Sequence, residues 1–244
     1  MQKQEEYILE VNQITKSFRE PARHLFERKR KKRVLDGVSF MIQKGEAYGL
    51  AGASGCGKST LARTVMGAFQ PEEGEIRVCG KRTDHLTVRQ RKEMYGEIQM
   101  IFQDSYSSLN PSMTVLRIIE EPMAVRKMYG KKERRERACM LLGQMGFAEN
   151  DYLRYPHEFS GGQRQKIAVA RALAVNPRIL VCDEPLASLD LLTRSEFIEL
   201  LNQVRREQGM SFLYISHDMG ELKRICSRIG IMRAGKIAEE RRVL

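Results

Sequence analysis

The chain has 244 residues, and 42 basic residues against 31 acidic ones give it a formal net charge of +11. With 42% hydrophobic and 30% charged residues it has the composition of a folded chain with a sizeable core, which excludes a disordered or collagen-like protein. Its longest apolar runs, such as residues 179–182, are far shorter than the roughly 18 to 20 residues needed to cross a bilayer, so no membrane span is expected.

The first elements in chain order are two strands that flank a strongly basic stretch. Residues 8–11 and 34–42 are rich in β-branched and aromatic residues, and Val38 and Phe40 lie at alternate positions of the second run. This pattern predicts a small antiparallel layer with a charged loop. The loop carries six consecutive basic residues, 28–33, which fit a solvated segment or a contact with an anionic surface, with nucleic acid as the alternative.

A short apolar run then leads into a glycine-rich turn. We expect a strand over residues 47–51 and a helix over residues 60–69. Other apolar runs that we expect to be strands alternate with helical segments, and they lie at residues 98–102, 179–182, 212–215 and 230–232. This alternation predicts a mainly parallel sheet with helices on its faces.

Residues 104–159 have a different pattern from the rest of the chain. They contain no long β-branched run, and helix-forming segments lie around residues 115–126 and 132–145. We interpret this stretch as an inserted helical lobe. After it, apolar residues at steps of three and four predict helices over residues 167–174 and 197–204.

Residues 52–59 fit the pattern G-x-x-x-x-G-K-[ST] between a predicted strand and a predicted helix, as a phosphate-binding loop requires. The glycines let successive backbone N–H groups point into one concavity, and the following helix adds its positive end. Lys58 would neutralise the β- and γ-phosphates, and Ser59 would bind Mg²⁺. The predicted contacts of this loop with a nucleotide are Gly52, Ser54, Gly55, Cys56, Gly57, Lys58, Ser59 and Thr60.

Two carboxylates follow the apolar run at residues 179–182. Asp183 and Glu184 thereby lie at the carboxyl end of a predicted buried strand, which is where open α/β sheets bind ligands. Asp183 suits Mg²⁺, directly or through water, and Glu184 suits the polarisation of an attacking water.

A further motif lies at residues 159–173, which begin Phe-Ser-Gly-Gly-Gln. This stretch resembles the signature helix of ABC transporter ATPases. Gln103 matches the Q-loop glutamine, residues 188–190 match the D-loop, and His217 matches the switch histidine. Phe18 falls where the family has an aromatic residue that stacks on adenine. The resemblance covers nearly the whole chain.

The resemblance implies an α/β fold that forms a single ABC ATPase domain over residues 1–244. The expected fold is a phosphate-loop ATPase core with a mainly parallel sheet, an N-terminal antiparallel β layer and a helical lobe inserted at about residues 104–159. It also implies ATP and Mg²⁺ as cofactors, with Glu184, His217 and Gln103 as catalytic residues. The implied metal ligands are Ser59, Gln103 and Asp183.

The resemblance further implies that two such subunits pair head to tail. Each ATP would lie between Lys58 of one subunit and Ser160 of the other, since a helix start and backbone donors favour a polyanion. The implied contacts with the other subunit's nucleotide are Ser160, Gly161, Gly162, Gln163 and Asp190. The signature departs from the common pattern at Phe159, where leucine is usual, but its serine and glycines are intact.

The stretch around Gln103 indicates the branch of the family. Residues 102–111 are similar to the Q-loop stretch of ATPase subunits from bacterial dipeptide, oligopeptide and nickel importers, although Ser105 stands where proline is frequent. The length of the chain is more like that of the second ATPase of nickel or metallophore systems. Peptide and metal-complex transport both remain open at this point.

An importer of this branch would have several partners at the cytoplasmic face of the cell membrane, where the chain would be peripheral. These are a second ABC ATPase subunit in a homo- or heterodimer, two transmembrane permease subunits and, indirectly, a solute-binding protein. The alternative is a soluble ABC ATPase that acts on nucleic acid or ribosomes, which the net charge would suit. The short insertion at residues 104–159 and the single phosphate loop argue against this alternative, so no nucleic-acid partner is expected.

Overall fold

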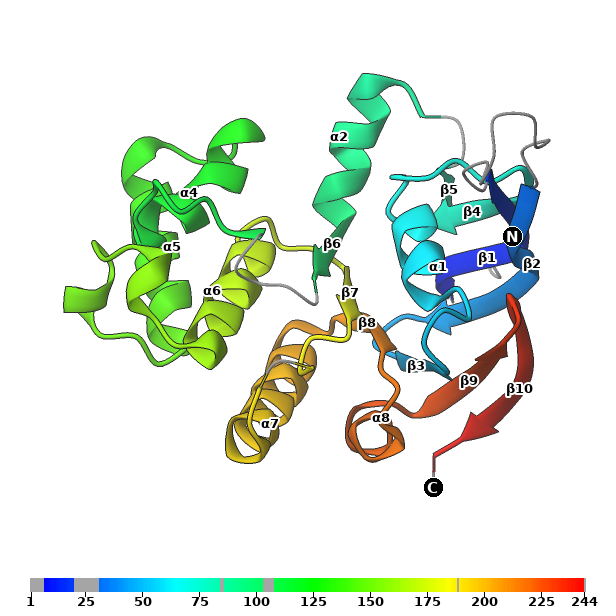
Figure 1. Ribbon diagram of the computed structural model, residues 1–244. Coiled ribbons are helices and arrows are strands. Elements are labelled where there is room, and N and C mark those ends of the chain that lie inside the picture. Colours follow the sequence, from blue (N-terminus) through cyan, green and yellow to red (C-terminus); the bar gives the residue numbers. More distant parts are fainter. Residues whose placement is uncertain (1–6, 20–30, 84–85, 103–107, 188, 244) are drawn as a thin grey trace, which may run out of the picture.

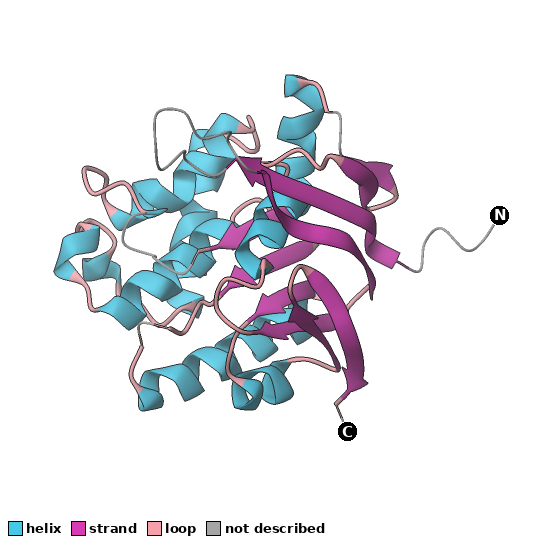
Figure 2. Cartoon of the chain, turned by 45° about the vertical axis from the view of Figure 1, so that its right-hand side comes forward, coloured by secondary structure: helices cyan, strands magenta, loops and turns pink. Residues whose placement is uncertain are grey.

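The computed structural model describes residues 7–19, 31–83, 86–102, 108–187 and 189–243. Two sheets and a set of helices make up this part of the chain (Figure 1). The strands gather on one side of the molecule and most of the helices on the other (Figure 2). No helix in the described ranges is long and apolar enough to cross a membrane.

The smaller sheet is the antiparallel layer expected near the N-terminus. Its strand order is β2-β1-β4-β5, and β1 pairs with both β2 and β4. Gly74 is required where β4 approaches β1, because an added Cβ would lie 2.3 Å from the carbonyl oxygen of Asn12. Val38, Phe40 and Ile42 are buried at alternate positions of β2, and they lie in one apolar cluster with buried residues of β1 and of the larger sheet. The strands are β1 Tyr7–Arg19, β2 Lys31–Gln43, β4 Glu73–Val78 and β5 Lys81–Arg82.

The larger sheet is mainly parallel, as expected. Its order is β10-β9-β3-β8-β7-β6, and only β10 runs antiparallel to its neighbour. Strands β7 and β8 are buried along their whole length, which explains their continuous apolar sequences. The strands are β3 Ala47–Gly52, β6 Ile98–Ile101, β7 Ile179–Asp183, β8 Ser211–Ile215, β9 Arg228–Arg233 and β10 Lys236–Arg242.

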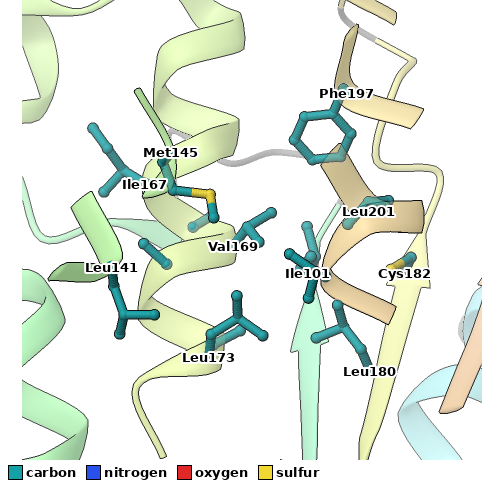
Figure 3. Close-up of a cluster of buried hydrophobic side chains, with 14 of the residues drawn as sticks. Ile101, Leu141, Met145, Ile167, Val169, Leu173, Leu180, Cys182, Phe197 and Leu201 are labelled. Carbon is teal, nitrogen blue, oxygen red and sulfur yellow. The ribbon is translucent and has the colours of Figure 1, made fainter. Parts of the chain in front are cut away.

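The helices divide into a group that covers the sheet and a group that forms the expected lobe. Helices α4 and α5 pack on each other and on α6, which connects this lobe to the sheet (Figure 1). Figure 3 shows Val169 of α6 between lobe residues such as Leu141 and sheet residues such as Ile101. The helices are α1 Lys58–Val65, α2 Val88–Glu97, α4 Val115–Val125, α5 Lys131–Gln144, α6 Gly161–Leu173, α7 Leu191–Gln208 and α8 Met219–Ile225.

Some elements differ from the sequence-based expectations. Helix α1 begins at Lys58, two residues earlier than expected. It ends at Val65, four residues earlier than expected, because Gly67 adopts a left-handed conformation that ends the helix. Helix α2 was not expected, since it has few apolar residues, and a capping box between Thr87 and Gln90 marks its start. The strands β4, β5 and β10 and the short helix α8 were also missed.

Candidate functional site

The turn between β3 and α1 forms a tightly seated loop. A Cβ added to Gly52 would lie 2.5 Å from the carbonyl oxygen of Met232, and one added to Gly57 would lie 2.8 Å from that of Val34. Only glycine fits at these two positions. Ser54 and Gly55 are exposed at the tip of the turn, while Cys56 packs against the apolar cluster beneath it. Glycine at these two positions lets the predicted phosphate-binding loop pack closely against β9 and β2, and Thr60 lies in the first turn of α1.

Lys58 places a buried cation inside this loop. Its side chain is only 4% exposed, and Nζ donates hydrogen bonds to the carbonyl oxygens of Gly52 at 2.7 Å and Ala53 at 3.1 Å. Oε1 of Glu184 lies 3.9 Å from Nζ. A buried ammonium with mostly neutral acceptors is suited to a polyanion, because phosphate oxygens can replace the carbonyl groups and neutralise the charge.

Ser59 and Asp183 bring two oxygen ligands together from different elements. Ser59 Oγ at the start of α1 donates a hydrogen bond to Oδ1 of Asp183 at the end of β7, at 3.1 Å. Burial raises the pKa of Asp183, and the hydrogen bond from Ser59 opposes this rise. No cluster of three or more metal-ligating side chains occurs in the described ranges. One carboxylate and one hydroxyl nevertheless fit Mg²⁺, which takes few protein ligands when it also binds nucleotide phosphates.

Glu184 and His217 form a second polar pair beside Lys58. Glu184 has a φ of +47°, a left-handed conformation at the point where the chain leaves β7. Its backbone N–H donates a hydrogen bond to the carbonyl oxygen of Ile215, and its Oε2 lies 3.3 Å from Nδ1 of His217. Such strained backbone persists where the surroundings fix it, often at functional sites. The pair presents a carboxylate that can accept a proton from water, next to an imidazole that can orient it.

Ser160 lies at the start of α6 as its N-cap. Its Oγ accepts a hydrogen bond from the backbone N–H of Gln163, whose side chain in turn accepts from the N–H of Ser160. A Cβ added to Gly162 would lie 2.5 Å from Cγ2 of Thr193, so the signature turn packs directly on the start of α7. Phe159 is buried edge-on against Phe147 at 5.5 Å between ring centroids, which explains how an aromatic residue fits in place of leucine.

Asp190 is the N-cap of α7. Its carboxylate accepts hydrogen bonds from the backbone N–H of Thr193 at 3.0 Å and from the Thr193 hydroxyl at 2.7 Å. These bonds hold the pKa of Asp190 below its usual range. Leu191 and Leu192, which follow it, are each 81% exposed. In the described part of the chain, neither Ser160 nor Asp190 bonds to the group around Lys58.

The two remaining sequence predictions have different outcomes. Phe18 lies on β1 of the smaller sheet, where its ring meets Phe69 edge-on at a centroid distance of 5.2 Å. Lys16 Nζ lies 5.7 Å from the centroid of the same ring. Gln103 lies outside the described residues, as does Ser188 of the D-loop stretch.

Sequence reasoning missed polar residues that adjoin these motifs. Arg194 lies four residues after Asp190 and Glu221 lies four residues after His217, and these two side chains approach to 3.5 Å. Arg194 lies one turn after Asp190, the N-cap of α7, so a helical spacing of four could have suggested it. His217 precedes α8, so no such signal points to Glu221.

Comparison with known proteins gives matches along most of the chain. Residues 35–187 match the family model described as ABC transporter. The chain is 42% identical over 238 residues to the oligopeptide transport ATP-binding protein AppF of Bacillus subtilis, with coverage of 96% of this chain and 72% of that protein. It is 40% identical over 236 residues to the oligopeptide transport ATP-binding protein OppF of Bacillus subtilis, with coverage of 96% and 75%.

A solved structure shares the fold. The dimeric post-hydrolysis structure of the ATP-binding cassette MJ0796, bound to ADP and Pi, superposes with a TM-score of 0.84 at 28% identity. The similarity covers 97% of this chain and 99% of that one. The α/β phosphate-loop ATPase fold expected from the sequence is thereby confirmed.

Proposed function

This chain belongs to the ABC transporter family as an ATPase subunit, and we propose that it hydrolyses ATP to drive the import of peptides through a membrane permease. One observation carries the catalytic part of this proposal. The carboxyl ends of β3, β7 and β8, which are neighbours in the parallel sheet, bring Lys58, the Ser59–Asp183 pair and the Glu184–His217 pair to one place. This is the set of groups that phosphoryl transfer to water requires.

Each side chain in this set has a distinct proposed role. Lys58 and the backbone N–H groups of the phosphate-binding loop hold the β- and γ-phosphates of ATP. Ser59 and Asp183 hold Mg²⁺, which neutralises charge on the phosphate oxygens when bound. Glu184 accepts the proton of the attacking water, and His217 keeps its carboxylate oriented. Phe18 stacks on adenine, and Gln103 contributes to the metal and water contacts.

A second ATPase subunit completes the site in this proposal. Ser160 caps the start of α6, and the backbone N–H groups there face the ATP that the partner subunit binds. The helix dipole at this N-terminus favours the negative charge of the phosphates. Asp190 and the exposed Leu191 and Leu192 would lie at the same subunit boundary. The dimeric state of the MJ0796 cassette supports this arrangement.

A groove between α2 and α4 is the proposed contact with the permease. Its apolar lining comes from Tyr95, Pro122, Val125 and Val175. Four basic residues, Arg89, Lys92, Arg126 and Lys127, also line it, against a single acidic residue, Glu93. This composition suits a short amphipathic segment with acidic residues, as a cytoplasmic segment of the permease could provide. The chain would accordingly be peripheral at the cytoplasmic face of the membrane.

The names of the relatives favour peptides over metal complexes as the solute. AppF and OppF are both oligopeptide transport ATP-binding proteins and match 96% of this chain. They do not favour the nucleic-acid alternative.

The test uses the transporter assembled with its two permeases and solute-binding protein in vesicles. Wild type should take up peptide on addition of Mg²⁺ and ATP, and Lys58→Ala should lose both uptake and phosphate release, because the phosphate charge loses its nearest cation. Uptake of nickel or a metallophore complex without uptake of peptide would contradict the proposed solute. Absence of both would contradict importer function.

The groove is tested with an exposed residue in it and one outside it. Val125 in the groove is 66% exposed, and Met140 on α5 is 49% exposed and not among the groove residues. Val125→Asp should abolish uptake and leave basal ATP hydrolysis intact, whereas Met140→Asp should leave both intact. Charge reversal of the basic run at residues 28–33 should have a smaller effect, since attraction to anionic lipid, at about 1 kcal/mol per charge, is screened and cannot select a permease. Loss of uptake with the basic run alone would overturn this assignment.

A further inference from the structure

A chain of polar contacts connects the loop before α7 to the turn that carries His217. Arg194 Nε donates a hydrogen bond to the carbonyl oxygen of Leu189 at 2.8 Å, and its Nη1 lies 3.5 Å from Oε1 of Glu221. The other carboxylate oxygen of Glu221 accepts a hydrogen bond from Ser216 Oγ at 2.8 Å. Ser216 directly precedes His217, so four residues join the two motifs.

Further contacts fix both ends of this series of polar contacts, which we call the link. At one end, Ser216 Oγ accepts the backbone N–H of Asp218 at 3.0 Å, and Asp218 caps α8, from which Glu221 projects. At the other end, Thr193 binds Asp190 and packs its methyl group where Gly162 has no Cβ. The first turn of α7 thus touches the signature turn, the loop with Asp190 and, through Arg194, the turn with His217.

The link is buried and charged, which makes it stiff. Glu221 and Ser216 are both buried, and the Arg194 side chain is largely covered. The Arg194–Glu221 contact is an ion pair at 3.5 Å, and the attraction between opposite charges is stronger in a medium of low dielectric constant than in water. The planar guanidinium can bind a carbonyl oxygen and a carboxylate at once, whereas a lysine ammonium at this position could not hold both in a fixed geometry.

We propose that Arg194 and Glu221 are positioning residues. They hold the turn with His217 at a fixed position relative to the loop that carries Asp190. This inference rests on the proposed function, in which His217 serves the chain's own nucleotide and Asp190 serves that of a partner subunit. Docking of the partner against the loop before α7 then acts on the Glu184–His217 pair through the backbone of Leu189. The two residues do not touch ATP, so they affect the rate of hydrolysis and not the affinity for nucleotide.

The same two helices carry a second ion pair that provides a matched control. Arg224 of α8 binds Oε1 of Glu199 at 3.2 Å and Oγ of Ser195 at 3.0 Å, both on α7. This pair also connects α7 to α8 between an arginine and a glutamate. It is exposed and reaches neither the loop before α7 nor the turn with His217.

The experiment compares Glu221→Gln and Arg194→Lys with Glu199→Gln and Arg224→Lys in the assembled transporter. Both link variants should lower kcat by about tenfold or more, because small misplacement of a catalytic group is costly. The affinity for ATP, measured with a fluorescent analogue, should stay within about twofold of wild type, and both control variants should match wild type in each measurement. The double variant Arg194→Lys/Glu221→Gln should be no slower than the slower single variant, since the two residues act as one unit.

Other outcomes decide against the link. Unchanged kcat in both link variants, additive effects in the double variant, or parallel loss of kcat, ATP affinity and thermal stability would each overturn it. Ser216→Ala removes the hydrogen bond to Glu221, together with the one from the Asp218 N–H, without a change of charge. It replaces Glu221→Gln in the comparison if that variant does not fold. A wild-type transporter without ATPase activity would contradict the proposed function, whereas active wild type with fully active variants would contradict only the link.

Discussion

The loop around Lys58 and the turn around Ser160 differ in how far the chain completes them by itself. Lys58 is buried and already bound to two carbonyl oxygens, with Glu184 close by. Among the described residues, Ser160 bonds only within its own helix start, and the leucines beside Asp190 are 81% exposed. The loop around Lys58 is a self-contained region, because the carbonyl oxygens that bind Lys58 can be replaced by phosphate oxygens. The turn around Ser160 and the start of α7 form a partner-facing region, because exposed apolar side chains beside capped helix starts are typical of a surface that binds another protein.

The largest effect is expected from Glu184 in the self-contained region, where a substitution should separate ATP binding from ATP hydrolysis. Glu184→Gln removes the proton acceptor but keeps the size of the side chain and the left-handed backbone. Phosphate release should fall by about 100- to 10,000-fold, as for loss of a general base, while ATP binding persists. Phosphate release under single-turnover conditions measures the rate, and equilibrium binding of labelled ATP is the control. Equal phosphate release by wild type and Glu184→Gln would remove Glu184 from the role of base.

A smaller effect is expected from the two glycines of the signature turn, which occupy different surroundings. A Cβ added to Gly162 would lie 2.5 Å from Thr193 Cγ2, whereas one added to Gly161 would meet its nearest neighbour, Leu189 Cδ2, at 3.9 Å. Gly162→Ala should therefore lower the free energy of unfolding by about 1–3 kcal/mol through overpacking. Gly161→Ala should not lower it, because alanine is favoured over glycine in a helix by about 1 kcal/mol. Urea denaturation of both variants measures the difference, and equal stabilities would show that α6 does not pack on α7 as described.

The sequence predicted the self-contained region better than the partner-facing one. The phosphate-binding loop has a contiguous pattern of fixed spacing, so Gly52, Gly57 and Lys58 could be assigned without the fold, although the contacts with Met232 and Val34 that require the two glycines could not. The parallel strands were found because burial on both faces makes them continuously apolar. The signature and D-loop residues were placed only through family resemblance, since a capped helix start by itself says nothing about what it faces.

What the sequence could not predict depends on contacts between distant segments. Strands β4 and β5 are short and polar on their outer faces; β4 is defined by its pairing with β1, and β5 by its pairing with β4. Helix α2 has a weak apolar pattern and is held by its cap and by tertiary packing. The link from Arg194 to Glu221 joins two helices that are separated by β8, and a single sequence has no signal for a contact of that range.

The two exposed leucines after Asp190 test the partner-facing region directly, and their replacement should have the smallest effect on the stability of the chain itself. Leu191→Ser/Leu192→Ser should leave the free energy of unfolding of the monomer within about 0.5 kcal/mol of wild type, because neither side chain is buried in the chain. Dimerisation in the presence of ATP should weaken by about tenfold or more, since burial of one leucine side chain contributes roughly 1.5–3 kcal/mol.

Sedimentation equilibrium measures the dimer, in the Glu184→Gln background so that ATP is not consumed. Leu153→Ser is the control, because Leu153 is also an exposed leucine but lies in the lobe, between the short helical turns Glu149–Asp151 and Pro156–Glu158. An unchanged dimer affinity in the double variant, or an equal loss in the control, would mean that the exposed leucines do not mark the subunit boundary. The contrast between the two regions would then rest on Ser160 and Gly162 alone, and the partner would approach α6 without covering the start of α7.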